Sequence, residues 1–83
     1  MNIILYTKRG CPWCDAVRSF LKINNLPFEE REVLSSKEYF DEMVAKSGQQ
    51  KAPTLDIDGH ILADSDEEQV KAYLEEKGVL SKK

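Results

Sequence analysis

The sequence predicts an α/β fold in which helices cover both faces of a mixed four-stranded sheet. The first observation is the order of extended and helix-periodic segments, which is β-α-β-α-β-β-α along the chain. The second is a strand–helix–strand unit over residues 2–33, because a helical crossover of this kind joins two parallel strands. The third is the dipeptide Asp58-Gly59 between the last two strands, which is a strong signal for an antiparallel hairpin.

The N-terminal half carries the parallel pair. Residues 2–6 form a continuous apolar run rich in β-branched and aromatic side chains, which is typical of a short buried strand. Pro12 stands at the first position of the next segment, where a helix tolerates proline, so we expect a helix over residues 12–24. Residues 28–33 are extended but highly charged, and they are therefore predicted to form a strand at the edge of the sheet.

Two later segments begin with the pattern of a capping box, in which side chains three residues apart satisfy free backbone amides at a helix start. The two pairs are Ser35 with Glu38, and Ser65 with Glu68. Apolar residues follow each pair at helical spacing, which predicts two further helices that pack against the sheet. Glycine can end a helix in a left-handed conformation, and the expected stops are Gly48 and Gly78.

The last two strands are expected over residues 54–57 and 60–63, on either side of the two-residue turn. Pro53 comes directly before the first of them. Because proline has no N–H to donate to a sheet, it fits only the first residue of that strand. His60 follows the turn and is expected to be a surface residue.

The composition fits one globular domain over residues 1–83, with 41% hydrophobic and 33% charged residues. The formal net charge is -3, which argues against general nucleic-acid binding, since such domains usually carry a basic face. No stretch approaches the ~20 apolar residues that span a bilayer, and the N-terminal apolar run is too short for a signal peptide. We therefore expect no membrane or nucleic-acid partner. We also expect a cytoplasmic protein, because two cysteines are too few for a disulfide-rich secreted domain, and a monomer.

The most informative motif is Cys-Pro-Trp-Cys at residues 11–14, at the predicted junction of the first strand and the first helix. A thiolate attacks a disulfide, and at Cys11 free backbone amides and the positive end of the helix would stabilise that charge. Lys8 and Arg9 add positive charge nearby. Cys14 lies one helical turn further, within reach of a mixed disulfide. We therefore predict that Cys11 is the nucleophile and Cys14 the resolving thiol.

Three other interpretations of the cysteine pair are weaker. A structural zinc site takes four ligands, largely Cys and His, and beyond the pair the chain offers only His60, so no metal is expected. A structural disulfide over so short a loop would constrain little of the unfolded chain. Inert buried cysteines are disfavoured by the neighbouring charges and by Pro12. In a reducing cytoplasm, such a pair of thiols is more typical of catalysis or metal binding than of a structural bridge.

The segment from Tyr6 to Cys14 resembles the active-site segment of the glutaredoxins, a family within the thioredoxin-like superfamily. Trp13 stands where the family usually has Tyr. The segments 46–48 and 52–53 are similar to the family's approach to its cis-proline, and residues 57–61 resemble its hairpin. The resemblance extends through residue 80.

This resemblance implies a thioredoxin-like fold, with a four-stranded mixed sheet flanked by three helices. It also implies an enzyme of cell redox homeostasis that reduces protein disulfides and glutathione mixed disulfides, with glutathione as the electron source. The implied glutathione contacts are a carboxylate at Lys8, a groove bordered by Trp13, backbone pairing at Ala52, a cis Pro53 facing Cys11, and the start of the third helix at Ser65 and Asp66.

The sequence departs from this family just before the third helix, where typical members have Gly-Gly and this chain has Ala63-Asp64. Glycine permits close backbone approach to a ligand, so the added Cβ and carboxylate are expected to narrow the site and repel glutathione carboxylates. Related redoxins that supply ribonucleotide reductase take electrons from thioredoxin reductase instead. Their Trp-Ser-Gly-Phe segment is missing here, but this electron source is an alternative.

Two further alternatives follow from the same resemblance. In one, two chains share an iron–sulfur cluster through Cys11 and bound glutathione, since such clusters need several thiolate ligands. That role is more typical of family members with one active-site cysteine, and Pro12 disfavours it. In the other, the chain is an interaction module without catalysis, and the intact cysteine pair argues against it.

Overall fold

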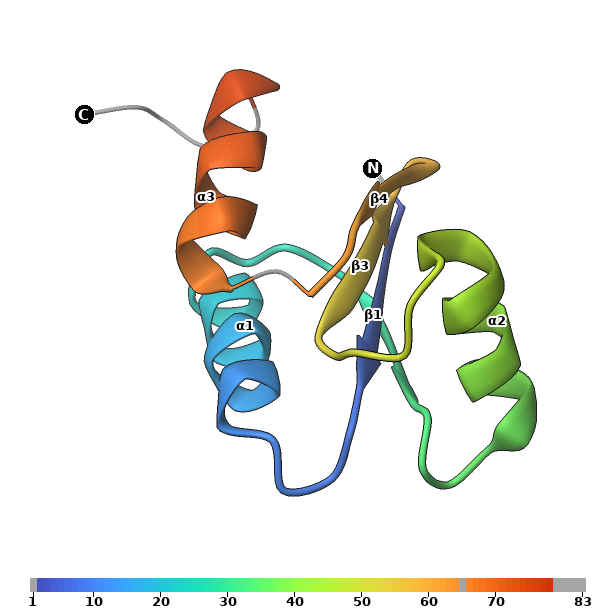
Figure 1. Ribbon diagram of the computed structural model, residues 1–83. Coiled ribbons are helices and arrows are strands. Elements are labelled where there is room, and N and C mark those ends of the chain that lie inside the picture. Colours follow the sequence, from blue (N-terminus) through green and yellow to red (C-terminus); the bar gives the residue numbers. More distant parts are fainter. Residues whose placement is uncertain (1, 65, 79–83) are drawn as a thin grey trace.

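The computed structural model describes residues 2–64 and 66–78, and its elements follow the predicted order (Figure 1). They are β1 (Ile3–Thr7), α1 (Pro12–Ile23), β2 (Glu29–Glu32), α2 (Lys37–Ser47), β3 (Thr54–Ile57), β4 (His60–Leu62) and α3 (Glu67–Glu76). Hydrophobic periodicity and the turn residues therefore located every described element, with small shifts at the boundaries.

The four strands form one mixed sheet in the order β2-β1-β3-β4, which confirms the predicted fold class. β1 runs parallel to β2, with Leu5 opposite Glu30, and antiparallel to β3, with Leu5 opposite Leu55. β3 and β4 form the predicted hairpin. β2 lies at an edge, as its charged side chains indicated, because charge on an edge strand hinders pairing with another chain.

Apolar side chains of the strands alternate between the two faces of the sheet, and each face has its own core. On one face, β1 and β3 pack against α1 and α3 through Ile3, Leu5, Val17, Leu21, Leu55, Ile57, Val70 and Leu74. On the other face, α2 covers a smaller cluster of Ile4, Tyr6, Val33 and Met43. Figure 1 shows α1 and α3 on one side of the sheet and α2 on the opposite side, so the prediction of helices on both faces is confirmed.

β1 extends one residue beyond the predicted run and ends with Thr7, which is fully buried. The Thr7 hydroxyl donates a hydrogen bond to the Glu30 carboxylate at 2.9 Å, and the Thr7 carbonyl accepts one from Val33 N–H at 2.8 Å. These bonds satisfy a polar residue inside the sheet. β1 lies between β2 and β3 in the sheet, and the loop after Thr7 begins at its C-terminal end. The C-terminal end of a central strand is a common place for a functional site in α/β folds.

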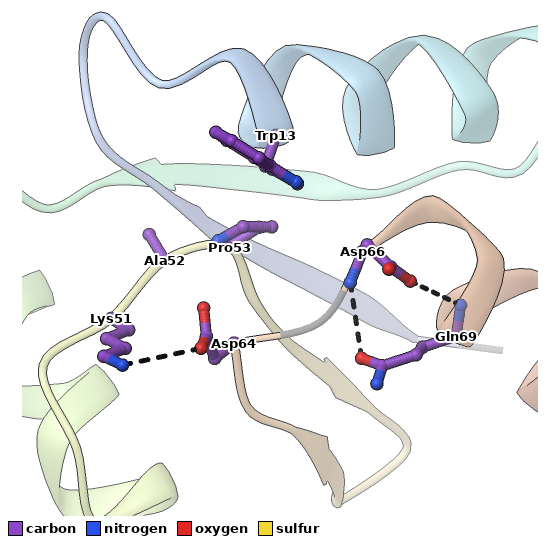
Figure 2. A pocket seen from close by; sticks show the side chains of 7 residues that line it. All are labelled: Trp13, Lys51, Ala52, Pro53, Asp64, Asp66 and Gln69. Carbon is purple, nitrogen blue, oxygen red and sulfur yellow. Dashed lines mark hydrogen bonds and ion pairs between the residues drawn. The ribbon is translucent and has the colours of Figure 1, made fainter.

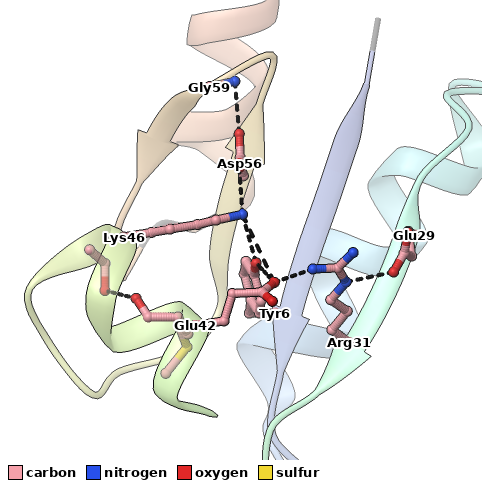
Figure 3. Close-up of polar contacts among 9 residues, drawn as sticks. Tyr6, Glu29, Arg31, Glu42, Lys46, Asp56 and Gly59 are labelled. Atoms are coloured by element: carbon pink, nitrogen blue, oxygen red, sulfur yellow. Dashed lines mark hydrogen bonds and ion pairs between the residues drawn. The ribbon is translucent and has the colours of Figure 1, made fainter. Parts of the chain in front are cut away.

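A polar network ties α2 to three strands through the buried Tyr6 hydroxyl (Figure 3). Tyr6 donates to Glu42 and accepts from Lys46 Nζ at 2.9 Å, and the same ammonium group contacts Asp56 at 2.7 Å. Arg31 on β2 donates to Glu42 as well. Every charge in the network has a partner of opposite sign, which offsets the cost of partial burial.

The expectation that Ser35 caps the second helix is wrong. Ser36 is the N-cap of α2, and its Oγ accepts a hydrogen bond from Tyr39 N–H at 3.3 Å. The Ser35 hydroxyl instead donates to the Glu32 carboxylate at the end of β2. The predicted stop is confirmed, because Gly48 has a left-handed backbone (φ 74°) and its N–H bonds to Val44 O.

The expected cap of the third helix is also shifted by one residue. Asp66 is the N-cap of α3 and forms a capping box with Gln69, whereas Ser65 lies outside the described residues. The helix ends at Glu76, and Gly78 follows with a φ of 77°. None of the helices in the described part of the chain is long and apolar enough to cross a membrane.

The hairpin turn has the predicted geometry. Asp58 and Gly59 have positive φ angles of 51° and 91°, as a two-residue turn matched to the strand twist requires. His60 is exposed, as expected, and its ring stacks on Tyr73 with 4.5 Å between the ring centres.

Candidate active site

Cys11 and Cys14 lie together at the start of α1. Cys11 is the N-cap residue, with an extended backbone (φ -100°, ψ 109°), and its Sγ accepts a hydrogen bond from Cys14 N–H at 3.3 Å. Pro12 occupies the first helical position, as predicted. A sulfur at an N-cap receives a free helix N–H and lies at the positive end of the helix, and both favour a thiolate.

The two thiols differ sharply in exposure. Cys11 is half-buried, whereas Cys14 has no exposed surface, and neither forms a disulfide. Burial raises the pKa of the Cys14 thiol to about 12, and its hydrogen bond with Cys11 adds to the rise. At neutral pH Cys14 is therefore a protonated thiol behind the surface, and a substrate from solution reaches Cys11 first.

Lys8 and Arg9 are the two cationic residues predicted beside Cys11, and one of them forms an ion pair. Lys8 is half-buried in the loop after β1, and its backbone hydrogen bond to Cys14 opposes the rise in the pKa of that thiol. Arg9 pairs with Glu32 at 3.3 Å, at the end of β2. Of these two side chains, Arg9 is therefore the one whose charge is paired within the described part of the chain.

A pocket of about 400 Å³ opens beside the start of α1 (Figure 2). This volume lies within the range of about 300–1,000 Å³ that small-molecule sites usually have. Three segments of the chain that are distant in sequence line it, namely Trp13 of α1, residues 51–53 before β3, and residues from the end of β4 to the first turn of α3. The lining residues are Trp13, Lys51, Ala52, Pro53, Asp64, Asp66 and Gln69.

Four of the residues expected to contact glutathione line this pocket. They are Trp13, Ala52, Pro53 and Asp66. Trp13 is 63% exposed, and the Ala52–Pro53 peptide bond is cis, as the resemblance implied. Lys8 and the two cysteines are not part of the lining, and Ser65 lies outside the described residues.

Asp66 has a structural role at the same place. Its carboxylate accepts a hydrogen bond from Gln69 N–H at 2.9 Å, while the Gln69 side chain accepts one from Asp66 N–H at 3.4 Å (Figure 2). This box orients the first turn of α3 toward the pocket. Sequence reasoning missed Gln69 as a pocket residue, although its spacing from Asp66 is the signal of a capping box.

The departure from the family pattern before the third helix lies in the pocket. Asp64 adopts a left-handed backbone (φ 50°), a region that glycine enters freely and other residues seldom do. Its carboxylate pairs with the Lys51 ammonium at 3.9 Å across one side of the lining (Figure 2). Lys51 was not among the predicted site residues, and only its position next to Ala52 could have indicated it.

Within the two described ranges, no three His, Cys, Asp or Glu side chains gather into a group that could hold a metal ion. The site itself consists of two free thiols beside a pocket with charged walls.

Solved structures of known proteins have the same fold. A crystal structure of a thioredoxin-like protein superimposes with a TM-score of 0.78 at 31% identity, and the match covers 84% of this chain and 96% of the other. The glutaredoxin-like NrdH-redoxin of Escherichia coli matches with a TM-score of 0.73 at 19% identity over 87% and 93% of the two chains, a likeness of fold alone. The fold is thioredoxin-like, and with two thiols at the start of its first helix this chain is a thiol–disulfide oxidoreductase.

Sequence comparison narrows this class to one family. The glutaredoxin family model matches residues 3–62, and the chain belongs to the glutaredoxin family. An uncharacterized glutaredoxin-like 8.6 kDa protein in the rubredoxin operon of Clostridium pasteurianum is 29% identical, and the match covers 88% of this chain and 97% of the relative. Glutaredoxin 3 of Escherichia coli strain K12 is 27% identical over 80% of each chain.

Proposed function

We propose that this chain reduces protein disulfides and glutathione mixed disulfides through Cys11 and Cys14, with glutathione as the reductant. The contrast between the two thiols carries the proposal. Cys11 is accessible and its sulfur accepts a helix N–H, whereas Cys14 is buried with a raised pKa. Such a pair has one sulfur ready to attack and a second held back as a thiol.

The exchange proceeds in two displacements. The Cys11 thiolate attacks one sulfur of the substrate, so that a Cys11–substrate disulfide forms, the substrate S–S bond breaks, and the departing sulfur takes up a proton. Cys14 then loses its proton and attacks Cys11, which forms the Cys11–Cys14 disulfide and releases the second substrate thiol. The substrate gains two electrons from the protein. Two molecules of glutathione then reduce the Cys11–Cys14 disulfide back to two thiols and become glutathione disulfide.

The pocket beside α1 is the proposed glutathione site. Trp13 borders it, the Ala52 backbone would pair with the glutathione cysteine as a strand does, and Pro53 would face Cys11. The start of α3, at Ser65 and Asp66, would hold the γ-glutamyl end through backbone N–H groups and a carboxylate. Lys8 would meet a glutathione carboxylate from the other side. Four of these residues line one pocket, which supports the proposal.

We place this reaction in the cytoplasm, in a monomer of one domain, because a reducing compartment keeps such thiols available. The protein partners are then proteins that carry oxidised cysteines.

Reduction by thioredoxin reductase is the second candidate. The observation in its favour is the charge of the pocket, which carries the carboxylates of Asp64 and Asp66 against the single ammonium of Lys51. A reductase that attacks the Cys11–Cys14 disulfide directly needs no glutathione in this pocket.

A coupled assay distinguishes the two electron sources. The oxidised protein is supplied with NADPH and either glutathione with glutathione reductase, or thioredoxin reductase alone, and NADPH consumption is followed with a disulfide substrate. We expect turnover with the glutathione system and its loss in Cys11→Ser. Turnover with thioredoxin reductase and none with the glutathione system would refute glutathione dependence. If the folded protein turned over with neither system, the exchange reaction itself would be refuted.

A further inference from the structure

We propose that Asp64 determines substrate specificity and makes the pocket favour a disulfide within a polypeptide over glutathione disulfide. This inference rests on the proposed function of the site and adds to it a ranking of substrates.

The residues that line the pocket carry more negative than positive charge. Among its seven residues, only Lys51, Asp64 and Asp66 are charged, which is one cation against two carboxylates. The Asp66 carboxylate accepts the Gln69 N–H in the capping box and is held at the helix start. Among the described residues, the partner of the Asp64 carboxylate is the Lys51 ammonium at 3.9 Å, and this carboxylate is about half exposed at the pocket.

The backbone keeps Asp64 at this place. β4 ends at Leu62 and Asp66 is the N-cap of α3, so Asp64 lies between two ordered elements that are a few residues apart. Its left-handed φ of 50° turns the chain there, and Figure 2 shows its side chain directed toward the Ala52–Pro53 segment. Aspartate is one of the few non-glycine residues that adopt this conformation readily, so the turn accommodates a carboxylate at the pocket.

The two substrate classes differ in the charges carried near the reacting disulfide. Glutathione is a tripeptide whose ends carry two free carboxylates and one ammonium group, so each half of its disulfide has a net negative charge. A cysteine in the interior of a polypeptide is followed and preceded by further amide bonds in place of these charged ends. A carboxylate that enters this pocket meets a lining with excess negative charge, whereas an amide carries no net charge and meets no such repulsion.

The effect of one charge at this exposure is modest. Two unit charges about 4 Å apart in water interact by an amount that corresponds to roughly a fivefold change in an equilibrium constant. The Lys51 ammonium, 3.9 Å from Asp64, attenuates the repulsion without removing it. We therefore expect a selectivity change of roughly 3- to 10-fold from this residue.

Single-turnover kinetics with two small disulfides test this ranking without any recycling reductase. The fully reduced protein is mixed with glutathione disulfide or with the disulfide of N-acetylcysteine amide, which has no carboxylate. The fluorescence of Trp13, the one tryptophan of the chain, follows oxidation of the neighbouring cysteines. The measured quantity is the second-order rate constant for each disulfide.

Asp64→Asn is the principal variant, because asparagine tolerates a left-handed backbone and removes only the charge. We expect it to raise the rate constant for glutathione disulfide about 3- to 10-fold and to change that for the neutral disulfide less than about 2-fold. Lys51→Gln should act in the opposite direction and slow glutathione disulfide alone. This second variant keeps the proposal testable if Asp64→Asn disturbs the fold.

Asp58→Asn is the matched control. Asp58 also has a left-handed backbone (φ 51°), but it lies in the turn at the other end of the β3–β4 hairpin, outside the pocket lining. The substitution changes the net charge by the same amount, and it should leave both rate constants unchanged. High salt should shrink the effect of Asp64→Asn, since screening weakens interactions between exposed charges.

Equal rate changes for both disulfides in Asp64→Asn, or no change in either, would overturn the inference while the proposed function stands. If the folded wild type reduces neither disulfide, the exchange reaction itself fails and this inference fails with it.

Discussion

The backbone N–H of Cys14 lies 3.3 Å from the sulfur of Cys11 and donates a hydrogen bond to it. The residue that is expected to resolve the mixed disulfide thus also stabilises the attacking sulfur. Because the donor belongs to the backbone, this support persists when the Cys14 side chain is replaced.

The two cysteines should therefore differ in the effect of their removal. Cys11→Ser should lower disulfide reduction by more than about 1000-fold, because it removes the nucleophile. Cys14→Ser should retain activity on a glutathionylated peptide, since a second glutathione can release the mixed disulfide on Cys11. The rate at which glutathione is released from the peptide measures the activity of both variants. Equal activity in wild type and Cys11→Ser would contradict the mechanism.

The buried thiol should also resist alkylation. In Cys11→Ser, we expect the Cys14 thiol to react with iodoacetamide only slowly at pH 7–9, with a rate that still increases above pH 10. Burial, as the largest cause, raises the pKa of Cys14 to about 12, so that the thiolate is scarce at lower pH. Mass spectrometry of quenched samples gives the rates. Cys14→Ser, which leaves Cys11 as the only thiol, should react much faster at pH 7, and equal rates would contradict the assignment.

Acid should weaken the polar network around Tyr6. The Tyr6 hydrogen bond, together with Arg31, holds the pKa of Glu42 below its usual value against the effect of burial. A carboxylate with a lowered pKa in the folded state contributes stability above the unfolded pKa of about 4.3, and this stability is lost as the pH falls through the folded pKa.

Glu42→Gln should therefore lower the free energy of unfolding by about 1 kcal/mol at pH 7, a value reduced for the partial exposure of the group. In this variant the free energy of unfolding should also fall less steeply between pH 5 and pH 3 than in the wild type. Urea unfolding at each pH measures this. Glu76→Gln, at an exposed position on α3, should change stability by less than about 0.5 kcal/mol at pH 7. An unchanged acid slope in Glu42→Gln would show that another group causes it.

Adjacent serines offer a direct test of the α2 cap. Ser36→Ala should cost about 1 kcal/mol, because it removes the oxygen that accepts Tyr39 N–H at the helix start. Ser35→Ala removes only an exposed hydrogen bond to Glu32 and should cost less than about 0.5 kcal/mol. Thermal or urea unfolding measures both variants. A larger loss in Ser35→Ala would place the cap one residue earlier.

The sequence predicted correctly those features that depend on local backbone preferences, and it misplaced those that depend on contacts with distant segments. The apolar run before Thr7, Pro12 at the start of α1, and Asp58-Gly59 in the hairpin each act through local backbone preferences, so they located elements correctly. The N-caps were misplaced because Ser35 and Ser36 have equal local preference. The position of the preceding strand decides which of them meets the free amides.

The site shows the same division. The sequence by itself determined the order of the elements, the cysteine pair and its place at a helix start, because spacing and Pro12 are sufficient for these. It did not place Lys51 opposite Asp64, or Gln69 in the wall of the pocket. These contacts join segments that are distant in the chain, and only the packing of β3, β4 and α3 brings them together. The tertiary structure likewise decided that Cys14 is buried, which separates two chemically identical thiols into an accessible nucleophile and a protected partner.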